Sequence, residues 1–198
     1  RFCHDGSCLD EALLETLPQE IDKMGENKLV VFHIMGSHGP NYYRRYPDAE
    51  RYFTPDCQRN DIENCDNAVL INSYDNTIRY TDYVLAKMID LLKQYQDRYD
   101  TALLYLSDHG ESLGEKGLYL HGTPYMLAPE EQTHIPMQLW MSAGFATGRG
   151  INRDCMADEA KRTELSQDNL FSSLLGVWDV QTTLYQPALD LFKPCRQP

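Results

Sequence analysis

Two short apolar runs, each followed by a loop that carries a histidine, constrain the fold of this chain more than any other feature. Residues 28–35 (KLVVFHIM) lead into 36–40 (GSHGP), and residues 101–107 (TALLYLS) lead into 108–110 (DHG). Apolar runs of this length, rich in β-branched residues or leucine, are typical of strands that are buried on both faces. We therefore predict two strands of a parallel sheet, each with a polar loop at its carboxyl end.

The segments around these runs alternate between helix and strand. Apolar residues at helical spacing predict a helix over residues 10–24, with Asp10 as its N-cap, and a longer helix over residues 75–95. Residues 135–141 (IPMQLWM) predict a third strand, and residues 168–175 (DNLFSSLL) begin a late helix. This alternation indicates an α/β fold whose parallel strands are covered on both sides.

The charge balance argues against nucleic acid as a partner. The chain has 30 acidic and 18 basic side chains, a formal net charge of −12. Its dense basic spots are Arg44 with Arg45 and Lys161 with Arg162, whereas nucleic-acid binding requires larger clusters of Lys and Arg. No run approaches the ~20 apolar residues that a membrane-spanning helix needs. If the protein works at a membrane, we expect its anchor to lie outside this sequence.

The six cysteines indicate disulfides and an oxidising compartment. Two close pairs in polar surroundings favour the local bridges Cys3–Cys8 and Cys57–Cys65, which leaves Cys155–Cys195 by elimination. The second bridge would pin residues 41–66, a segment without a clear period that we interpret as an irregular insertion. The alternative is six free or metal-binding thiols. A cysteine zinc site is disfavoured because the sequence contains no C-x-x-C spacing.

Side chains capable of catalysis or metal binding gather in the loops after the two apolar runs. In open parallel sheets, the loops at the carboxyl ends of strands converge on a ligand. Asp108 and His109 offer a carboxylate oxygen and an imidazole nitrogen, both good zinc ligands. His38 and His121 could contact phosphate oxygens, hold another metal or transfer a proton. Glu111 could act as an acid or base, or bind an ammonium group.

Each of these residues also has a structural interpretation. Asp108 could cap the next segment beside a surface histidine, and a single loop histidine is often merely exposed. Glu111 could be a solvated glutamate in a first helical turn. His33 lies inside a predicted strand and His134 precedes one, so we expect both to be packing residues.

Five longer runs occur along the chain in the order FHIMGSHGPNYYRRYP, FTPDC…NCDNAV, NTIRYTDYVLAKMIDLL, LLYLSDHGESLGEKGLYLHGTPY and THIPMQLWMS. Together they resemble the lipid A phosphoethanolamine transferases, a family within the alkaline phosphatase superfamily that includes the mobile colistin-resistance enzymes. The resemblance covers residues 28–142 and continues through SQDNLFSSLLG. It implies a parallel-sheet α/β/α sandwich of the alkaline phosphatase/sulfatase type, incomplete in this chain. Residues 1–198 would form a single domain, the C-terminal portion of a periplasmic catalytic domain.

The resemblance also implies roles for particular residues. In that family, zinc is held by a glutamate, a nucleophilic threonine and an Asp-His pair, which matches Asp108 and His109. The family's substrate-site histidines, where extra zinc can bind, match His38 and His121. Glu111 matches a motif glutamate near that site. The family's glutamate ligand and threonine lie upstream, and no segment here matches them, so the resemblance implies that these 198 residues lack the nucleophile and are inactive alone.

The implied activity is zinc-dependent transfer of phosphoethanolamine from phosphatidylethanolamine to lipid A, through a covalent phosphoethanolamine-threonine intermediate. It would take place at the periplasmic face of the bacterial inner membrane, reached through a segment absent here. The added ammonium would confer resistance to cationic peptides such as polymyxin and colistin. The protein is expected to be a monomer. Family disulfides match Cys57–Cys65 directly, and Cys3–Cys8 resembles a variant of another family bridge.

Two kinds of alternative function remain open. A phosphoglycerol transferase, sulfatase or phosphatase of the same superfamily shares the Asp-His-Gly turn, and the head group that moves from a labelled lipid separates these activities. The other alternative is a non-catalytic binding fragment that keeps the histidines without the chemistry. Metal titration distinguishes it, because two ligands hold zinc far more weakly than four.

Overall fold

The computed structural model describes residues 2–4 and 6–197 and divides the chain into two compact units. Unit 1 consists of Arg1–Asp90 and His109–Pro136, and unit 2 consists of Leu91–Asp108 and Met137–Pro198. The single-domain organisation expected from the sequence stays a prediction. Among the described residues, no helix combines the length and the apolar character needed to cross a bilayer.

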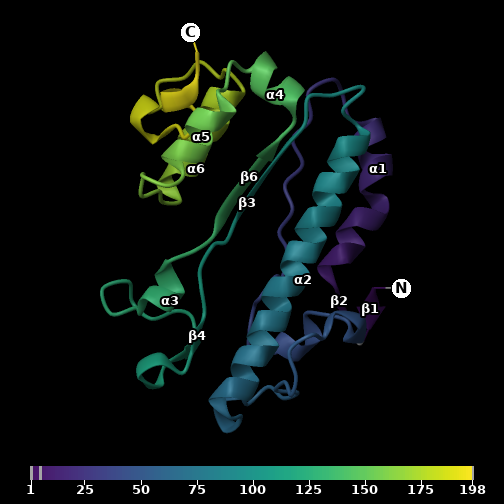
Figure 1. Ribbon diagram of the computed structural model, residues 1–198, viewed down its shortest axis with the longest axis vertical. Helices are drawn as coiled ribbons and strands as arrows, with labels where there is room; N and C mark the ends of the chain where they lie inside the picture. The colour runs from purple at the N-terminus through teal and green to yellow at the C-terminus, as the bar shows by residue number, and fades with distance from the viewer. Residues whose placement is uncertain (1, 5, 198) are drawn as a thin grey trace. The chain divides into compact units, whose positions relative to one another are not determined.

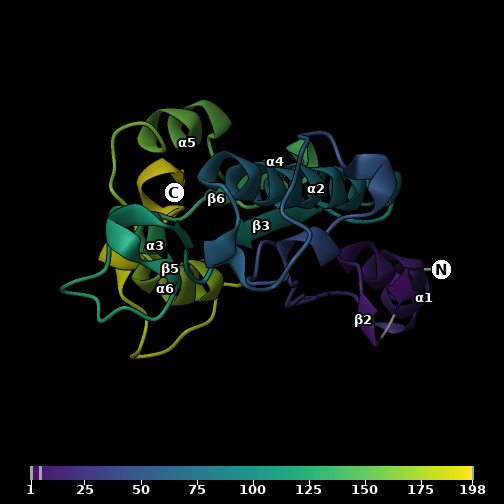
Figure 2. The same cartoon turned by 90° about the horizontal axis from the view of Figure 1, so that it is seen from below.

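Unit 1 is built around one long helix, α2 (Asn67–Gln94), whose last turn belongs to unit 2. The helix begins eight residues before the predicted start at residue 75, so the periodicity located it and missed its first two turns. The other helices and strands of this unit are α1 (Leu13–Lys23), α3 (Glu130–Thr133), β1 (Cys3–His4), β2 (Ser7–Cys8), β4 (Ser112–Leu113) and β5 (Tyr119–Leu120). Figure 1 shows α1 running alongside α2, and Figure 2 shows β2 beside α1.

Asp10 does not cap the first helix. A 3₁₀ turn precedes α1, and the Asp10 carboxylate instead accepts hydrogen bonds from the backbone N–H groups of Met35 and Gly36, both at 2.8 Å. The capping prediction is therefore wrong, because a tertiary contact competes for the same carboxylate. This contact ties the start of α1 to the loop that carries His38.

Residues 28–35 pair with no strand in the described part of the chain, so the predicted strand is wrong. Their side chains nevertheless alternate between half-buried and exposed, as in an extended segment with one face covered. On the open face, Leu29, Val31 and Met35 are 54%, 82% and 41% exposed. A strand also requires a neighbouring backbone for its hydrogen bonds, and the apolar pattern of a single segment carries no information about that neighbour. His33 and His134 are exposed, so the expectation that they pack is wrong too.

Unit 2 contains the strand pair β3 (Ala102–Leu106) and β6 (Met137–Met141), which lie side by side in Figure 1. The pair is antiparallel, with Ala102 opposite Met141. The prediction of parallel pairing is wrong for these two strands, because the connection between them contains the β4–β5 pair, a 3₁₀ turn and α3 rather than a crossover helix. The remaining helices are α4 (Ala143–Gly148), α5 (Arg153–Glu159) and α6 (Asp168–Val177).

The six cysteines form three disulfides, Cys3–Cys8, Cys57–Cys65 and Cys155–Cys195, the same pairs as expected from the sequence. The last one joins α5 to the C-terminal segment of unit 2. Met141, Ala146, Ile151 and Phe192 form a buried apolar cluster in this unit.

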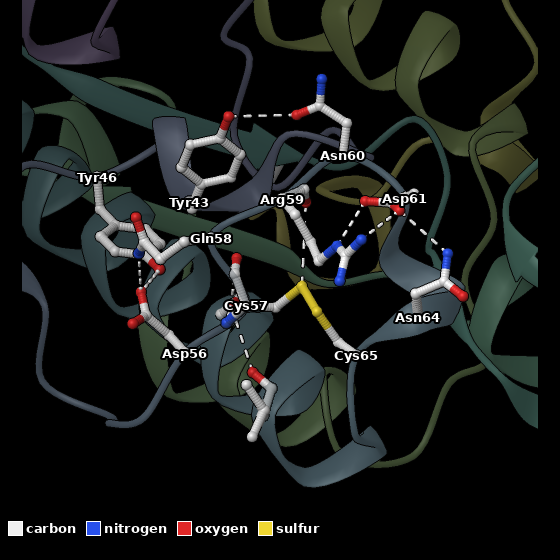
Figure 3. The surroundings of a disulfide bond; sticks show 12 residues. Tyr43, Tyr46, Asp56, Cys57, Gln58, Arg59, Asn60, Asp61, Asn64 and Cys65 are labelled. Carbon is white, nitrogen blue, oxygen red and sulfur yellow. Dashed lines mark hydrogen bonds and ion pairs between the residues drawn. A yellow bond between two sulfur atoms is a disulfide. The ribbon is translucent and has the colours of Figure 1, made fainter.

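Residues 41–66 form the irregular insertion that the sequence predicted, with three short 3₁₀ turns and the Cys57–Cys65 bridge (Figure 3). Side chains on α2 accept hydrogen bonds from the backbone N–H groups of this insertion. Asn76, fully buried, accepts N–H groups from residues 52 and 53, and Ser73 accepts the N–H of Cys57 at 2.6 Å. Buried backbone without regular structure requires such partners, so α2 is the support on which the insertion is built.

A buried carboxylate organises the outer part of this insertion. Asp56 is 7% exposed and accepts hydrogen bonds from the Tyr46 hydroxyl at 2.7 Å and from Gln58 at 2.6 Å (Figure 3). The Arg51 guanidinium neutralises its charge, with Nε at 2.7 Å. Burial, together with the hydrogen bond to Asp56, raises the pKa of Tyr46 to about 12, so the phenol remains a donor at neutral pH.

Candidate active site

Three of the predicted histidines come together in unit 1. The ring centroids of His109 and His121 lie 3.8 Å apart, and that of His38 lies 5.3 Å from His121 and 6.3 Å from His109. His38 follows the extended residues 28–35, and His121 follows β5. Chain segments far apart in sequence thus bring three imidazoles to one place, as the loops after the apolar runs predicted for His38 and His109.

All three imidazoles direct Nδ1 toward an oxygen. The partner of His38 is the carbonyl of Gly39 at 2.7 Å, and the partner of His109 is the carbonyl of Gly110 at 2.9 Å. His121 Nδ1 lies 2.8 Å from the Glu111 carboxylate. Because these oxygens accept hydrogen bonds, they favour the neutral tautomer with the proton on Nδ1 and the lone pair on Nε2. Metal-binding histidines are oriented in the same way, so this donor set fits a metal ion.

Glu111 is buried next to the histidines and is fixed by hydrogen bonds. Its side chain is 3% exposed, one carboxylate oxygen meets His121, and the other accepts the Tyr42 hydroxyl at 2.8 Å. Tyr42 is 1% exposed, and burial together with the nearby Glu111 charge raises the pKa of its hydroxyl well above the ordinary value. Tyr42 therefore stays protonated and donates to Glu111, which in turn accepts from His121.

Ligand atoms of His109, Glu111 and His121 lie within 4.8 Å of one another, a spacing at which one metal ion could be held. The Glu111 carboxylate meets Tyr42, His121 and, at 3.5 Å, the backbone N–H of Gly39, and these hydrogen bonds give it a different part in this cluster. A carboxylate that already accepts from Tyr42 and from His121 orients the imidazole, as carboxylates do behind metal-bound histidines. We therefore assign Glu111 to positioning rather than to direct coordination.

Local backbone geometry aims His121 at its neighbours. Leu120, immediately before it, has a left-handed φ of 64°, and Gly122, immediately after it, has a φ of 96°. A leucine in this region costs about 1 to 3 kcal/mol and persists only where packing enforces it. The Leu120 side chain packs against the buried cluster that contains Tyr42. The Leu120 side chain also approaches Gly39 so closely that a Cβ on Gly39 would be only 2.5 Å from it. The loop that carries His38 therefore packs tightly against Leu120.

Gln132, on α3, links the loops that carry these side chains. It is 6% exposed, and its amide donates to the Ser112 hydroxyl at 2.9 Å and accepts the N–H of Thr123 at 3.3 Å. Its backbone carbonyl accepts the N–H of Gly110 at 3.0 Å. Ser112 follows Glu111, and Thr123 lies two residues after His121. The buried Gln132 side chain therefore connects the segment that carries Glu111 to the segment that carries His121.

Asp108 belongs to unit 2, whereas His109 opens the second segment of unit 1. Asp108 is exposed, and within unit 2 its backbone carbonyl accepts a hydrogen bond from Gln167 at 2.5 Å. The predicted Asp108–His109 metal pair therefore stays a prediction. His38, Glu111 and His121, which the sequence assigned to catalysis, lie together with His109.

Comparison with known proteins shows which family the chain belongs to. The sulfatase family model matches residues 1–180. The chain belongs to the sulfatase family. Phosphoethanolamine transferase EptA of Salmonella typhimurium is 50% identical over 195 residues, which cover 98% of this chain and 36% of that protein.

Two solved structures carry the same fold. The integral membrane protein lipooligosaccharide phosphoethanolamine transferase A (EptA) of Neisseria meningitidis matches with a TM-score of 0.96 and 43% identity, over 100% of this chain and 37% of that one. The C-terminal periplasmic domain of phosphoethanolamine transferase EptC from Campylobacter jejuni matches with a TM-score of 0.85 and 47% identity, over 96% of this chain and 60% of that one.

These matches confirm the resemblance seen in the sequence and the alkaline phosphatase/sulfatase type of fold. The chain spans about a third of the length of the curated relatives it matches. Those relatives bear the names of phosphoethanolamine transferases, and one solved relative is an integral membrane protein.

Sequence reasoning missed Tyr42 and Gln132. Tyr42 lies in the irregular insertion among other aromatic residues, and nothing in their pattern singles it out. Gln132 precedes the third predicted strand and reads as an ordinary polar residue. A signal for either would have had to come from the fold, because both act through partners distant in sequence.

Proposed function

We propose that this chain supplies the histidine-bearing part of a catalytic domain that transfers phosphoethanolamine from phosphatidylethanolamine to lipid A. The observation that carries the proposal is the set of three imidazoles whose Nδ1 atoms all meet oxygens, with buried Glu111 behind one of them. The names of the relatives support the choice of substrates. The proposed location is the periplasmic face of the bacterial inner membrane, and the proposed form is a monomer.

Zinc is the metal that this donor set fits best, because neutral imidazole and carboxylate are common zinc ligands. Asp108 and His109 would hold it, and His38 and His121 could hold an additional ion. When bound, zinc neutralises charge on the phosphoryl oxygens and lowers the pKa of a coordinated hydroxyl. The nucleophile is proposed to lie outside these 198 residues.

In phosphoryl transfer, His38 and His121 would bind phosphoryl oxygens, and His121 would protonate the leaving group. When His38 and His121 also carry a proton on Nε2, that N–H is the ring donor available to phosphoryl oxygens, since each Nδ1 is engaged. In its protonated form, His121 can give the Nε2 proton to the departing alkoxide oxygen of the donor lipid. Until that transfer, Glu111 stabilises the imidazolium through the 2.8 Å contact to Nδ1, and Tyr42 keeps the carboxylate in place.

The product explains a proposed biological role. Attaching phosphoethanolamine to a phosphate of lipid A adds one ammonium group beside a negative charge. The lipid then attracts cationic peptides such as polymyxin and colistin less strongly, since that attraction is electrostatic. We propose resistance to these peptides as the outcome of the reaction.

A head-group transfer assay tests the proposed activity. The complete protein containing this chain is incubated with zinc, lipid A and phosphatidylethanolamine labelled in its ethanolamine group. We expect the label to appear on lipid A and diacylglycerol to be released in equal amount. Phosphatidylglycerol labelled in its head group, a sulfate ester and a phosphate monoester serve as competing substrates. Turnover of one of these instead of phosphatidylethanolamine would assign the chain to a rival activity of the same superfamily.

The positioning role of Glu111 gives a prediction for the isolated chain. Replacing it by glutamine is expected to weaken zinc binding by about 10- to 100-fold. An amide presents one acceptor and one donor, so it cannot accept from both Tyr42 and His121. Zinc titration followed by calorimetry measures the effect.

Glu130→Gln is the matched control for this titration. Glu130 also lies near a histidine, His134 at 3.6 Å, but both side chains are more than 80% exposed. The control is expected to bind zinc as the wild type does. Equal zinc affinity of Glu111→Gln and the wild type would show that the carboxylate does not orient a metal ligand.

A further inference from the structure

Three consecutive apolar side chains are exposed just beyond the histidine cluster. Tyr125, Met126 and Leu127 are 85%, 93% and 72% exposed. The turn is closed by backbone hydrogen bonds from residues 127 and 128 to the carbonyl of Pro124, at 2.8 and 2.9 Å. We call residues 125–127 the apolar tip. Exposure of this extent in three successive large side chains costs hydration free energy and therefore points to a partner.

The base of the loop that bears the apolar tip is fixed to the candidate site. Thr123 donates its N–H to Gln132, and Gln132 donates to Ser112, the residue after Glu111. The loop also begins at His121, whose imidazole contacts Glu111 at 2.8 Å. The apolar tip is consequently anchored to the residues that position the histidines, rather than hanging from a separate part of unit 1.

The charge distribution favours a lipid surface as the partner. Residues 117–129 contain no Asp, Glu, Lys or Arg, in a chain with 48 such side chains (18 basic and 30 acidic) and a net charge of −12. An acidic protein is repelled by anionic lipids, whereas an uncharged segment with Tyr, Met and Leu can enter the interfacial region of a zwitterionic bilayer. Tyrosine is enriched there because its ring is apolar and its hydroxyl is polar.

We propose that the apolar tip inserts into the head-group region of a phospholipid bilayer and so brings the histidines to the depth of the lipid phosphodiester. This inference rests on the proposed function, in which the donor is a membrane lipid. Met126 is five residues from His121, a span of at most ~18 Å for an extended chain. Interfacial insertion reaches ~5–10 Å, so the tip can be immersed while His121 remains near the surface.

Tryptophan placed in the tip tests the insertion directly. Met126→Trp is prepared in the isolated chain and mixed with vesicles of phosphatidylethanolamine and phosphatidylcholine, with and without brominated acyl chains. We expect a blue shift of the added emission and quenching by the brominated lipid. Leu184→Trp is the matched control, because Leu184 is also apolar and 63% exposed but lies in unit 2. The native Trp140 and Trp178 give the background to subtract.

A binding assay complements the spectroscopy. Replacing all three tip residues by serine is expected to lower the vesicle-bound fraction in co-sedimentation about tenfold, since binding scales with the buried apolar area. His134→Ala, at a side chain that is 81% exposed and outside residues 117–129, should leave vesicle binding unchanged. If the chain binds vesicles through its tip and the complete protein transfers no head group, the proposed function fails and the insertion stands.

Two outcomes would overturn the insertion. One is equal quenching of Met126→Trp and Leu184→Trp, or quenching of neither, because the tip would then have no special access to lipid. The other is a blue-shifted emission of the introduced tryptophan when Met126→Trp is made in the complete protein and measured without vesicles. That result would show that another part of the protein covers the tip.

Discussion

Replacing His109 by alanine in the complete protein is expected to abolish phosphoethanolamine transfer and to lower zinc occupancy. The imidazole lies 3.8 Å from that of His121, and its Nδ1 contact with the carbonyl of Gly110 presents Nε2 as a ligand atom. Removing one ligand from a zinc site weakens binding steeply, because the ion's affinity depends on the number of ligands. The measurements are the labelled-lipid transfer assay and the zinc content of the purified protein.

His134→Ala provides the matched control for this experiment. The His134 side chain is 81% exposed, and its Nδ1 lies 3.6 Å from a carboxylate oxygen of Glu130, which is 83% exposed. Both transfer and zinc content should match those of the wild type. Retained transfer by His109→Ala, with zinc unchanged, would show that the metal assignment is wrong.

Replacing Gly110 by alanine should destabilise the chain by about 2 to 4 kcal/mol. A Cβ at this position would overlap the backbone carbonyl oxygen of Glu131. The obstacle is backbone, so it cannot rotate away as a side chain would. Relief requires the loop to move, which would also stretch the 3.0 Å hydrogen bond from Gly110 N–H to Gln132 and shift the flanking His109 and Glu111.

Urea unfolding of the isolated chain, followed by circular dichroism, measures this loss. Gly25→Ala is the control, since a Cβ at Gly25 meets nothing within 4 Å, and its midpoint should stay close to that of the wild type. A Gly110→Ala midpoint equal to the wild-type value would show that the loop at residues 108–110 adapts without cost. The expected order of stability is therefore wild type and Gly25→Ala together, followed by Gly110→Ala.

Local patterns predicted the parts of the fold that depend on local physics. The periodicity of apolar residues located α2, residues 168–175 (DNLFSSLL) indicated the start of α6, and the short apolar runs located β3 and β6. The direction of pairing was beyond these patterns, because a strand's composition does not specify which neighbour supplies its hydrogen bonds. The same limit explains residues 28–35, whose alternating exposure shows an extended backbone without a described partner strand.

For the candidate site, too, the sequence predicted part of the arrangement: the residues that form it, but not the contacts that orient them. Glycine-containing loops after apolar runs indicated His38 and His109. The run LLYLSDHGESLGEKGLYLHGTPY indicated Glu111 and His121. The hydrogen bonds that orient these side chains could not be predicted, because Tyr42 is 69 residues from Glu111 in sequence. Gly110 has a structural importance that the sequence does not reveal, which is the close approach of another backbone.

The open face of residues 28–35 has a practical consequence for work with the isolated chain. Leu29, Val31 and Met35 line one side of an extended backbone that pairs with no strand in the described part of the chain. Extended apolar edges of this kind stick to copies of themselves. Mass measured in solution for the isolated polypeptide would then rise with concentration, and dimers or larger particles found in this way would be no guide to the assembly state of the complete protein.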